Sequence, residues 1–363
     1  GSQPIPRMET AMRMETAMRS VIHTAVAIAI ATVPLAACGG GDPTDPGPDN
    51  ERVPISDMTA AQSYLGYPGG LYPGGNIIPA AHLAAGTARA RAIQLLDVNG
   101  NPSASGKYAL VSIGMSNTTQ EFCSASTPAC ASWTFMGQAA VDASVNRSTL
   151  VIVNGARGGQ AASAWLSPTS TEYNRIRDTW LTPAGLSEQQ VQIAWVKVAN
   201  PQPSVSLPAT TSDAFTLVAQ MGTIARTLKT RYPNLQQIFF SSRIYAGYAT
   251  TTLNPEPYAY ETGFAVKWIV QAQIDQIEQN RVVDTRAGDL DYRTGAPWLA
   301  WGPYLWGDGM TPRSDGLVWA RADLEGDGTH PAQSGEQKVG AMLLEFFKTS
   351  PVTSCWFVAG QTC

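Results

Sequence analysis

Three residues that lie far apart in the sequence could together form a hydrolytic centre: Ser116, His330 and Asp327. Ser116 lies in "GMSN", just after the apolar run 107–114, where the end of a strand could present its hydroxyl. A serine nucleophile needs a base that accepts its proton and a carboxylate that orients this base. In "GDGTH", Asp327 precedes His330 by three residues, so its carboxylate can reach the imidazole within one short loop. The chemistry that these residues predict is acyl transfer through a covalent intermediate.

The histidine content narrows the choice of the base. The chain has three histidines: His23 in the N-terminal apolar region, His82 before the first clear strand, and His330. Only His330 follows a nearby carboxylate in a short loop. As the alternative, "DLEGDGTH" is a plain or calcium-type turn with an exposed histidine, and Ser116 is a polar turn residue.

The elements that must position these residues alternate between strands and helices. Continuous apolar runs, typical of parallel strands covered on both faces, occupy residues 107–114, 149–156, 191–199 and 235–247. Apolar residues recur at helical spacing within 217–228, 266–277 and 339–347, with Ser212-Asp213 and Ser334 as candidate caps. This alternation predicts an α/β fold with a mostly parallel sheet, whose sites form beyond the carboxyl ends of the strands.

Four short motifs occur in order: "GMSN", "NGARGGQ" and "VAN" after three successive strands, and "DGTHP" before the last helix. Together they resemble the four conserved blocks of the SGNH/GDSL hydrolases, a family of esterases. The resemblance implies a three-layer α/β/α, flavodoxin-like fold with Ser116 as the nucleophile and Asp327 and His330 as its partners. It also implies that Ser116, Gly159 and Asn200 form an oxyanion hole. Donors in such a hole stabilise the negative charge that develops in the tetrahedral intermediate.

The match covers about residues 107–348 and departs from the family pattern in two places. Met115 replaces the Asp of the usual GDS, so that "GMSN" is closer to the "GQSN" of the sialate O-acetylesterase-like branch. The stretch "ARGGQAASAW" resembles that branch as well, but its usual "QGE" after a Trp is missing here. Asn200 lacks the usual preceding Gly and following Asp. Taken alone, the glycines at 158–159 could be a tight turn and Asn200 a turn residue.

The N-terminal region has the pattern of an export signal. Three arginines precede "VIHTAVAIAIATVPLAAC", a short apolar run that ends in small residues. The ending "LAAC" resembles a bacterial lipobox, which implies a signal peptide with an N-terminal extension over residues 1–37 and a lipid on Cys38. Residues 38–54, rich in Gly, Pro and Asp, would then be a tether, and residues 55–363 a single domain. A plain signal cleaved near Ala37 and a membrane anchor are the alternatives.

Four further cysteines agree with export. An even number of cysteines in an exported chain predicts disulfides, and the local pairings Cys123–Cys130 and Cys355–Cys363 would close short loops. Free buried thiols are the alternative. A metal site is disfavoured because no histidine lies at ligand spacing.

Composition limits the classes of partner. The net charge is −4, without the basic surface that nucleic-acid binding requires. We predict no nucleic-acid partner, no cofactor and no metal, and contact with a membrane only through the lipid anchor.

Two features beside the predicted centre leave alternatives open. Residues 297–319 contain five aromatic residues that could hold a sugar ring, although such a stretch more often fills the core under a long loop. Arg243 and Lys197 could meet a substrate carboxylate, although we expect a structural ion pair for both.

These observations predict an exported, lipid-anchored serine esterase. Its substrate would be a small ester or an acylated carbohydrate that carries a short acyl group such as acetyl. One alternative is a surface lipoprotein that binds carbohydrate on the same fold without catalysis. The other is an acyltransferase that uses the same three residues.

Overall fold

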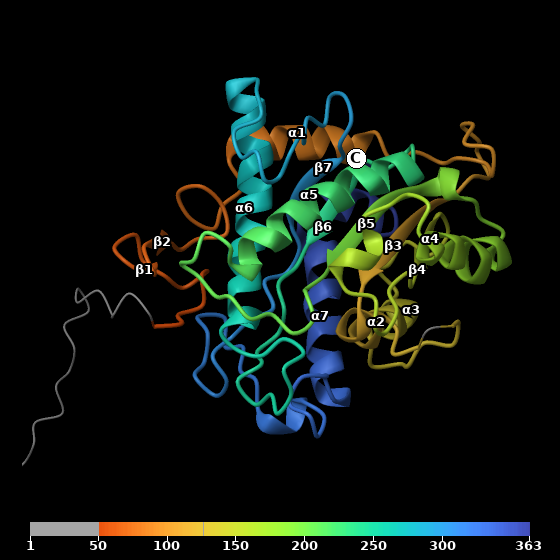
Figure 1. Cartoon of the computed structure of the whole chain (residues 1–363). Coiled ribbons are helices and arrows are strands. Elements are labelled where there is room, and N and C mark those ends of the chain that lie inside the picture. The colour runs from red at the N-terminus through yellow and green to blue at the C-terminus, as the bar shows by residue number, and fades with distance from the viewer. Residues whose placement is uncertain (1–50, 126) are drawn as a thin grey trace, which may run out of the picture. The chain divides into compact units, whose positions relative to one another are not determined.

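A five-stranded parallel sheet forms the centre of the molecule in the computed structural model, which describes residues 51–125 and 127–363 (Figure 1). The strand order is β4-β3-β5-β6-β7. The bounds are β3 (Tyr108–Gly114), β4 (Leu150–Val153), β5 (Val191–Lys197), β6 (Gln237–Phe240) and β7 (Trp298–Trp301). Every residue of β3 and β5 is buried, as expected of central strands covered on both faces.

Helices cover both faces of this sheet. The helices are α1 (Ala80–Arg91), α2 (Ser116–Phe122), α3 (Phe135–Val141), α4 (Thr171–Arg175), α5 (Asp213–Arg231), α6 (Tyr258–Gln279), α7 (Gln333–Thr349) and α8 (Ser354–Phe357). Successive residues of a strand point to opposite faces. Val111 accordingly belongs to a core with α5 and α6, and Leu110 to a second core with α1, α2, α3, α7 and α8. The fold is therefore a three-layer α/β/α arrangement, as the sequence predicts.

Most of the elements read from the sequence are confirmed, with shorter strands than expected. The run 235–247 contains only four strand residues, β6, and the chain then continues as a loop. A short two-stranded hairpin, β1 (Ser63–Tyr64) and β2 (Tyr67–Pro68), precedes the sheet. The expected cap at Ser334 is wrong, because α7 begins at Gln333 and the Ser334 hydroxyl donates to the Asp323 carboxylate instead.

Both local disulfides are present. Cys123 is bonded to Cys130, and Cys355 to Cys363, so the predicted pairings are confirmed. The predicted signal, Cys38 and most of the tether lie outside the described residues. Within the described ranges, no helix combines the length and the apolar character that a membrane span requires.

His82 is a buried structural residue. Its side chain is 5% exposed, stacks on Trp298, and lies with Nε2 2.7 Å from the carbonyl oxygen of Leu299. Burial lowers the pKa of His82 from 6.5 to about 4, and the hydrogen bond to Leu299 only partly opposes this shift. The imidazole is therefore neutral in the folded protein at neutral pH.

This pKa predicts an acid-dependent loss of stability. Between pH 6.5 and 4 the unfolded chain binds a proton at residue 82 that the folded chain does not bind. The free energy of unfolding should fall by about 3 kcal/mol over this window through His82 alone. His82→Gln, which retains a donor for the Leu299 carbonyl, should remove this component. The check is the difference between wild type and variant in urea denaturation at several pH values. Parallel pH profiles would contradict the prediction.

Candidate active site

The end of β3 presents Ser116 at the carboxyl edge of the sheet. Gly114 has φ +155°, and a Cβ there would lie 2.2 Å from the carbonyl oxygen of Lys197 at the end of the neighbouring strand. Only glycine permits this close approach. The Thr118 hydroxyl then donates to the same Lys197 carbonyl, at 2.6 Å. The turn that carries Ser116 is thus fixed to the end of β5, and Ser116 becomes the first residue of α2.

The three residues predicted to act together form one chain of hydrogen bonds. His330 Nε2 lies 2.8 Å from Ser116 Oγ, and His330 Nδ1 lies 2.6 Å from Asp327 Oδ2. With the Nδ1 proton donated to the carboxylate, Nε2 is free to accept the serine proton. The Ser116 hydroxyl and the imidazole are only partly buried, so a substrate can reach them.

Backbone donors hold Asp327 in its orientation. Its Oδ1 accepts from the amides of His330 at 3.0 Å and Thr329 at 2.9 Å, while Oδ2 meets the imidazole. Burial raises the pKa of Asp327, but these hydrogen bonds and the imidazole outweigh burial and bring the pKa below its ordinary value. Asp327 is therefore an ionised acceptor that fixes the orientation of His330.

Asn117 joins the turn that carries Ser116, the nucleophile turn, to the loop of residues 327–330, the histidine loop. We did not assign this role from the sequence. Its side chain is 2% exposed, and Nδ2 donates to the carbonyl oxygen of Thr329 at 2.9 Å. The only signal in the sequence was its place after Ser116 in "GMSN". The bond fixes the distance between the loop of His330 and the turn of Ser116.

Ser116 and His330 open onto a pocket of about 100 Å³ that also contains the two other predicted donors, Gly159 and Asn200. Gly159 has φ +78°, in the left-handed region that favours glycine. The remaining lining residues are Met115, Asn117, Ala161, Ala199, Pro201, Arg243, Leu253, Asn254 and Thr329. The structure thus brings four of the five predicted residues to one cavity, with Asp327 directly behind His330.

The loop of Asn200 is held by two neighbours. The side-chain amide of Asn254 donates from Nδ2 to the backbone carbonyl oxygen of Asn200 at 3.1 Å. Burial raises the pKa of Asp213, and a hydrogen bond with the Asn200 side chain partly opposes this shift. An amide that engages Asp213 with one N–H has a second N–H for another acceptor.

A buried ion pair lies beneath the nucleophile turn. Lys197, at the end of β5, bonds both carboxylate oxygens of Glu121 on α2, and both side chains are fully buried. Burial lowers the pKa of Lys197 to about 8, against the attraction of Glu121. The expected structural ion pair is confirmed for Lys197. For Arg243 it is wrong, because no carboxylate of the described residues forms an ion pair with its guanidinium.

The aromatic stretch 297–319 fills the core. Its aromatic residues are at most 5% exposed, namely Trp298, Trp301, Tyr304, Trp306 and Trp319. Trp298 and Trp301 belong to β7, a strand that we did not predict. These ring faces are therefore not available to a sugar, which settles the alternative in favour of a core role.

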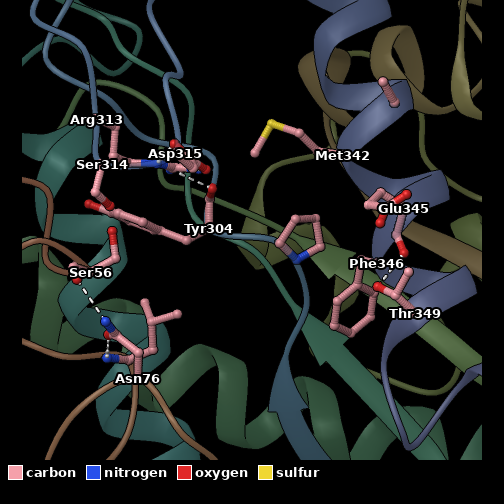
Figure 2. Close-up of a pocket in the computed structure, with 13 residues that line it drawn as sticks. Ser56, Asn76, Tyr304, Arg313, Ser314, Asp315, Met342, Glu345, Phe346 and Thr349 are labelled. Atoms are coloured by element: carbon pink, nitrogen blue, oxygen red, sulfur yellow. Dashed lines mark hydrogen bonds and ion pairs between the residues drawn. The ribbon is translucent and has the colours of Figure 1, made fainter.

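A larger hollow of about 560 Å³ lies between Tyr304, Arg313 and α7, as Figure 2 shows. The guanidinium of Arg313 is already bonded to Asp315 and to two backbone carbonyl oxygens. None of the predicted catalytic residues lines this hollow. Nor does any group of three or more His, Cys, Asp or Glu in the described parts of the chain have the arrangement of a metal site.

Comparison with known proteins gives only distant likenesses in fold. No protein-family model matches the sequence, and a comparison with curated proteins finds no match. A GDSL-like lipase from Parabacteroides merdae has 13% identity and a TM-score of 0.37, with 70% of this chain and 97% of that chain covered. A variant of a Geobacillus acetyl-xylooligosaccharide esterase has 12% identity and a TM-score of 0.36, with 67% and 95% covered. A salicylyl-acyltransferase of a tetracycline biosynthetic pathway has 15% identity and a TM-score of 0.35, with 69% and 58% covered. At such TM-scores the likeness assigns neither a family nor an activity.

Proposed function

We propose that this chain is a serine esterase in which Ser116, His330 and Asp327 form the catalytic triad. The observation that carries the proposal is the continuous series of hydrogen bonds from Ser116 Oγ through the imidazole to the Asp327 carboxylate, at the mouth of a pocket. A serine with only a structural role in the turn after β3 does not need a histidine whose orientation is fixed by a carboxylate.

The reaction follows from the positions of the protons. Ser116 Oγ attacks the ester carbonyl carbon while His330 Nε2 accepts the hydroxyl proton, and the carbonyl oxygen becomes an oxyanion. The intermediate collapses, the alcohol leaves with the proton from His330, and an acyl-serine remains. Water, deprotonated by the same imidazole, then attacks the acyl-serine and releases the acid. Asp327 orients and stabilises the imidazolium and does not itself take the proton.

The size of the pocket favours a short acyl group. A volume of about 100 Å³ is well below the several hundred Å³ of typical sites for drug-sized ligands. An acetyl group fits such a space, whereas a long fatty acyl chain would have to extend outside it. Carbohydrate as the alcohol is supported by the resemblance of "GMSN" and "ARGGQAASAW" to acetylesterase motifs.

Fluorophosphonate labelling tests the proposal. An activated serine forms a stable adduct at Ser116, identified by peptide mass spectrometry, and Ser116→Ala should give none.

A series of p-nitrophenyl esters of increasing acyl length, followed by acetylated polysaccharides, should show the highest kcat/KM for the acetyl group. Absence of labelling would indicate a binding protein without catalysis. Acyl transfer to a sugar that outcompetes hydrolysis would indicate an acyltransferase.

Asn200→Ala tests the third oxyanion donor. If the Asn200 side chain stabilises the oxyanion, its loss should lower kcat by about 100- to 1000-fold, with little change in KM. Asn200→Asp has nearly the same shape but presents an acceptor, so its kcat should fall at least as far. Steady-state kinetics and circular dichroism on both variants are the measurements. Near wild-type kcat in a folded Asn200→Ala would make Asn200 a turn residue.

We also propose export and lipid anchoring. The two disulfides support an oxidising compartment. The division into a signal up to residue 37, a lipidated Cys38 with a tether up to residue 54, and a domain over 55–363 rests on the sequence pattern. The net charge of −4 supports the absence of a nucleic-acid partner.

A further inference from the structure

Arg243 is a buried cation in the wall of the candidate active site. It follows β6 by three residues and lines the same pocket as Ser116 and His330. The residue is only 2% exposed, and its backbone amide donates to the Thr262 hydroxyl at 2.9 Å. Arginine stays protonated in proteins, so this position carries a positive charge at the site.

The guanidinium has no hydrogen-bond partner among the residues that the structure describes. Its Nε and Nη2 are enclosed and bond to no described residue, and no bond of Nη1 to residues 51–125 or 127–363 is present either. A buried charge is normally paired and hydrogen-bonded, because it otherwise loses its solvation without compensation. Since Nε and Nη2 are enclosed, Nη1 is the edge through which Arg243 can meet a ligand in the pocket.

Three carboxylates interact electrostatically with Arg243, but each is already hydrogen-bonded to other groups. Glu121 bonds Lys197, and Asp327 bonds the imidazole of His330. Glu256 accepts from Trp306 Nε1 at 2.8 Å and from two backbone amides. Burial lowers the pKa of Arg243, and these carboxylates oppose this shift and favour the charged guanidinium, but they leave its donors unused.

We infer that the substrate carries a carboxylate close to the scissile ester and that Arg243 binds it. The inference deepens the proposed esterase function and rests on it. The positive guanidinium complements the charge of a carboxylate, and a hydrogen bond from Nη1 to a carboxylate oxygen would be charge-assisted. A pocket of about 100 Å³ that contains both Ser116 and Arg243 leaves only a few atoms between the ester carbonyl and the carboxylate. The carboxylate belongs either to the acyl group or to the alcohol, as in an acetylated uronic acid.

Two matched pairs of substrates distinguish these sources. Acetylated glucuronic acid and acetylated glucose share the acetyl ester and differ in a carboxylate on the alcohol. Mono-p-nitrophenyl succinate and p-nitrophenyl butyrate share the leaving group and differ in a carboxylate on the acyl chain. In one of the two pairs, wild-type kcat/KM should be at least tenfold higher for the anionic member. Equal kcat/KM within both pairs would overturn the inference.

Variants of Arg243 separate recognition from structure. Arg243→Met should lower kcat/KM about 100-fold more for the anionic than for the neutral member of the preferred pair. Arg243→Lys, which keeps the charge, should recover part of the preference. Arg157→Gln is the matched control. Arg157 is a partly exposed cation that precedes Gly158 and Gly159 in the chain, and Arg157 itself does not line the pocket. Arg157→Gln should change both members equally. An equal loss for both members in Arg243→Met would assign a structural role and overturn the inference.

Two measurements keep the inference testable if a variant does not fold or if the esterase proposal fails. In wild type, glucuronate or succinate should inhibit hydrolysis of the neutral ester more strongly than glucose or butyramide. If Ser116 is not labelled and no ester is turned over, calorimetry with the same compounds still tests carboxylate binding. Failure of the esterase proposal thus appears as absent labelling. Failure of the carboxylate inference appears as equal inhibition and equal binding by the charged and neutral compounds.

Discussion

Ser116→Ala is expected to lower kcat by about 10⁶-fold, because no covalent route remains when the nucleophile is removed. The hydroxyl lies 2.8 Å from His330 Nε2. Among the described residues, no other hydroxyl is hydrogen-bonded to this nitrogen. The measurement is single-turnover and steady-state hydrolysis of p-nitrophenyl acetate by purified wild type and variant. Because the change removes one oxygen, the fold should be retained.

Ser334→Ala is the matched control for this experiment. Ser334 lies in the first turn of α7, close to the histidine loop, but its hydroxyl donates to Asp323 and the pocket does not include it. Its kcat should stay within a factor of a few of wild type. If Ser116→Ala, shown to be folded, kept more than one per cent of the wild-type kcat, Ser116 would not be the nucleophile.

Glu121→Ala is expected to give the largest loss of stability. The substitution leaves the Lys197 ammonium fully buried without its partner, and breaking one side of a buried pair typically costs about 3–5 kcal/mol. Urea denaturation at pH 7 measures the change in the free energy of unfolding. The reason for the loss is the unpaired charge rather than the lost attraction alone.

The double variant Glu121→Leu/Lys197→Met separates these two causes. Apolar side chains of similar volume replace both charges, so most of the lost stability should return. If the double variant were as unstable as Glu121→Ala, the loss would come from packing around α2 and not from an unpaired ammonium.

The layered fold and the site follow from the sequence because three of the motifs come directly after buried strands and the fourth, "DGTHP", comes just before the last long helix. The carboxyl ends of parallel strands meet at one edge of the sheet, so Ser116 after β3 and Asn200 after β5 must lie close together. The pairing of Asp327 with His330 is local, and a spacing of three residues is enough to indicate it.

Other features depend on contacts that no local pattern contains. Trp298–Trp301 is a strand only because it pairs with β6, and its four residues resemble any short buried aromatic segment. Whether Arg243 has a partner depends on which carboxylates arrive beside it, and those on Glu121 and Asp327 are already bonded elsewhere. The hydroxyl of Ser334 has an acceptor on Asp323, eleven residues away, which competes with capping.

The loop of Asp327 and His330 has a consequence for how this sequence can change over time. The Asp327 carboxylate accepts hydrogen bonds from the backbone amides of Thr329 and His330 and also bonds the imidazole of His330. All three bonds require the present spacing of three residues between Asp327 and His330. A single inserted or deleted residue there would break all three bonds together. By contrast, Ser116 and His330 are 214 positions apart in the sequence, and only the folded structure brings them together at the edge of the sheet. Surface loops within that interval can grow or shrink, and related chains can differ greatly in length there while the loop keeps its three-residue spacing.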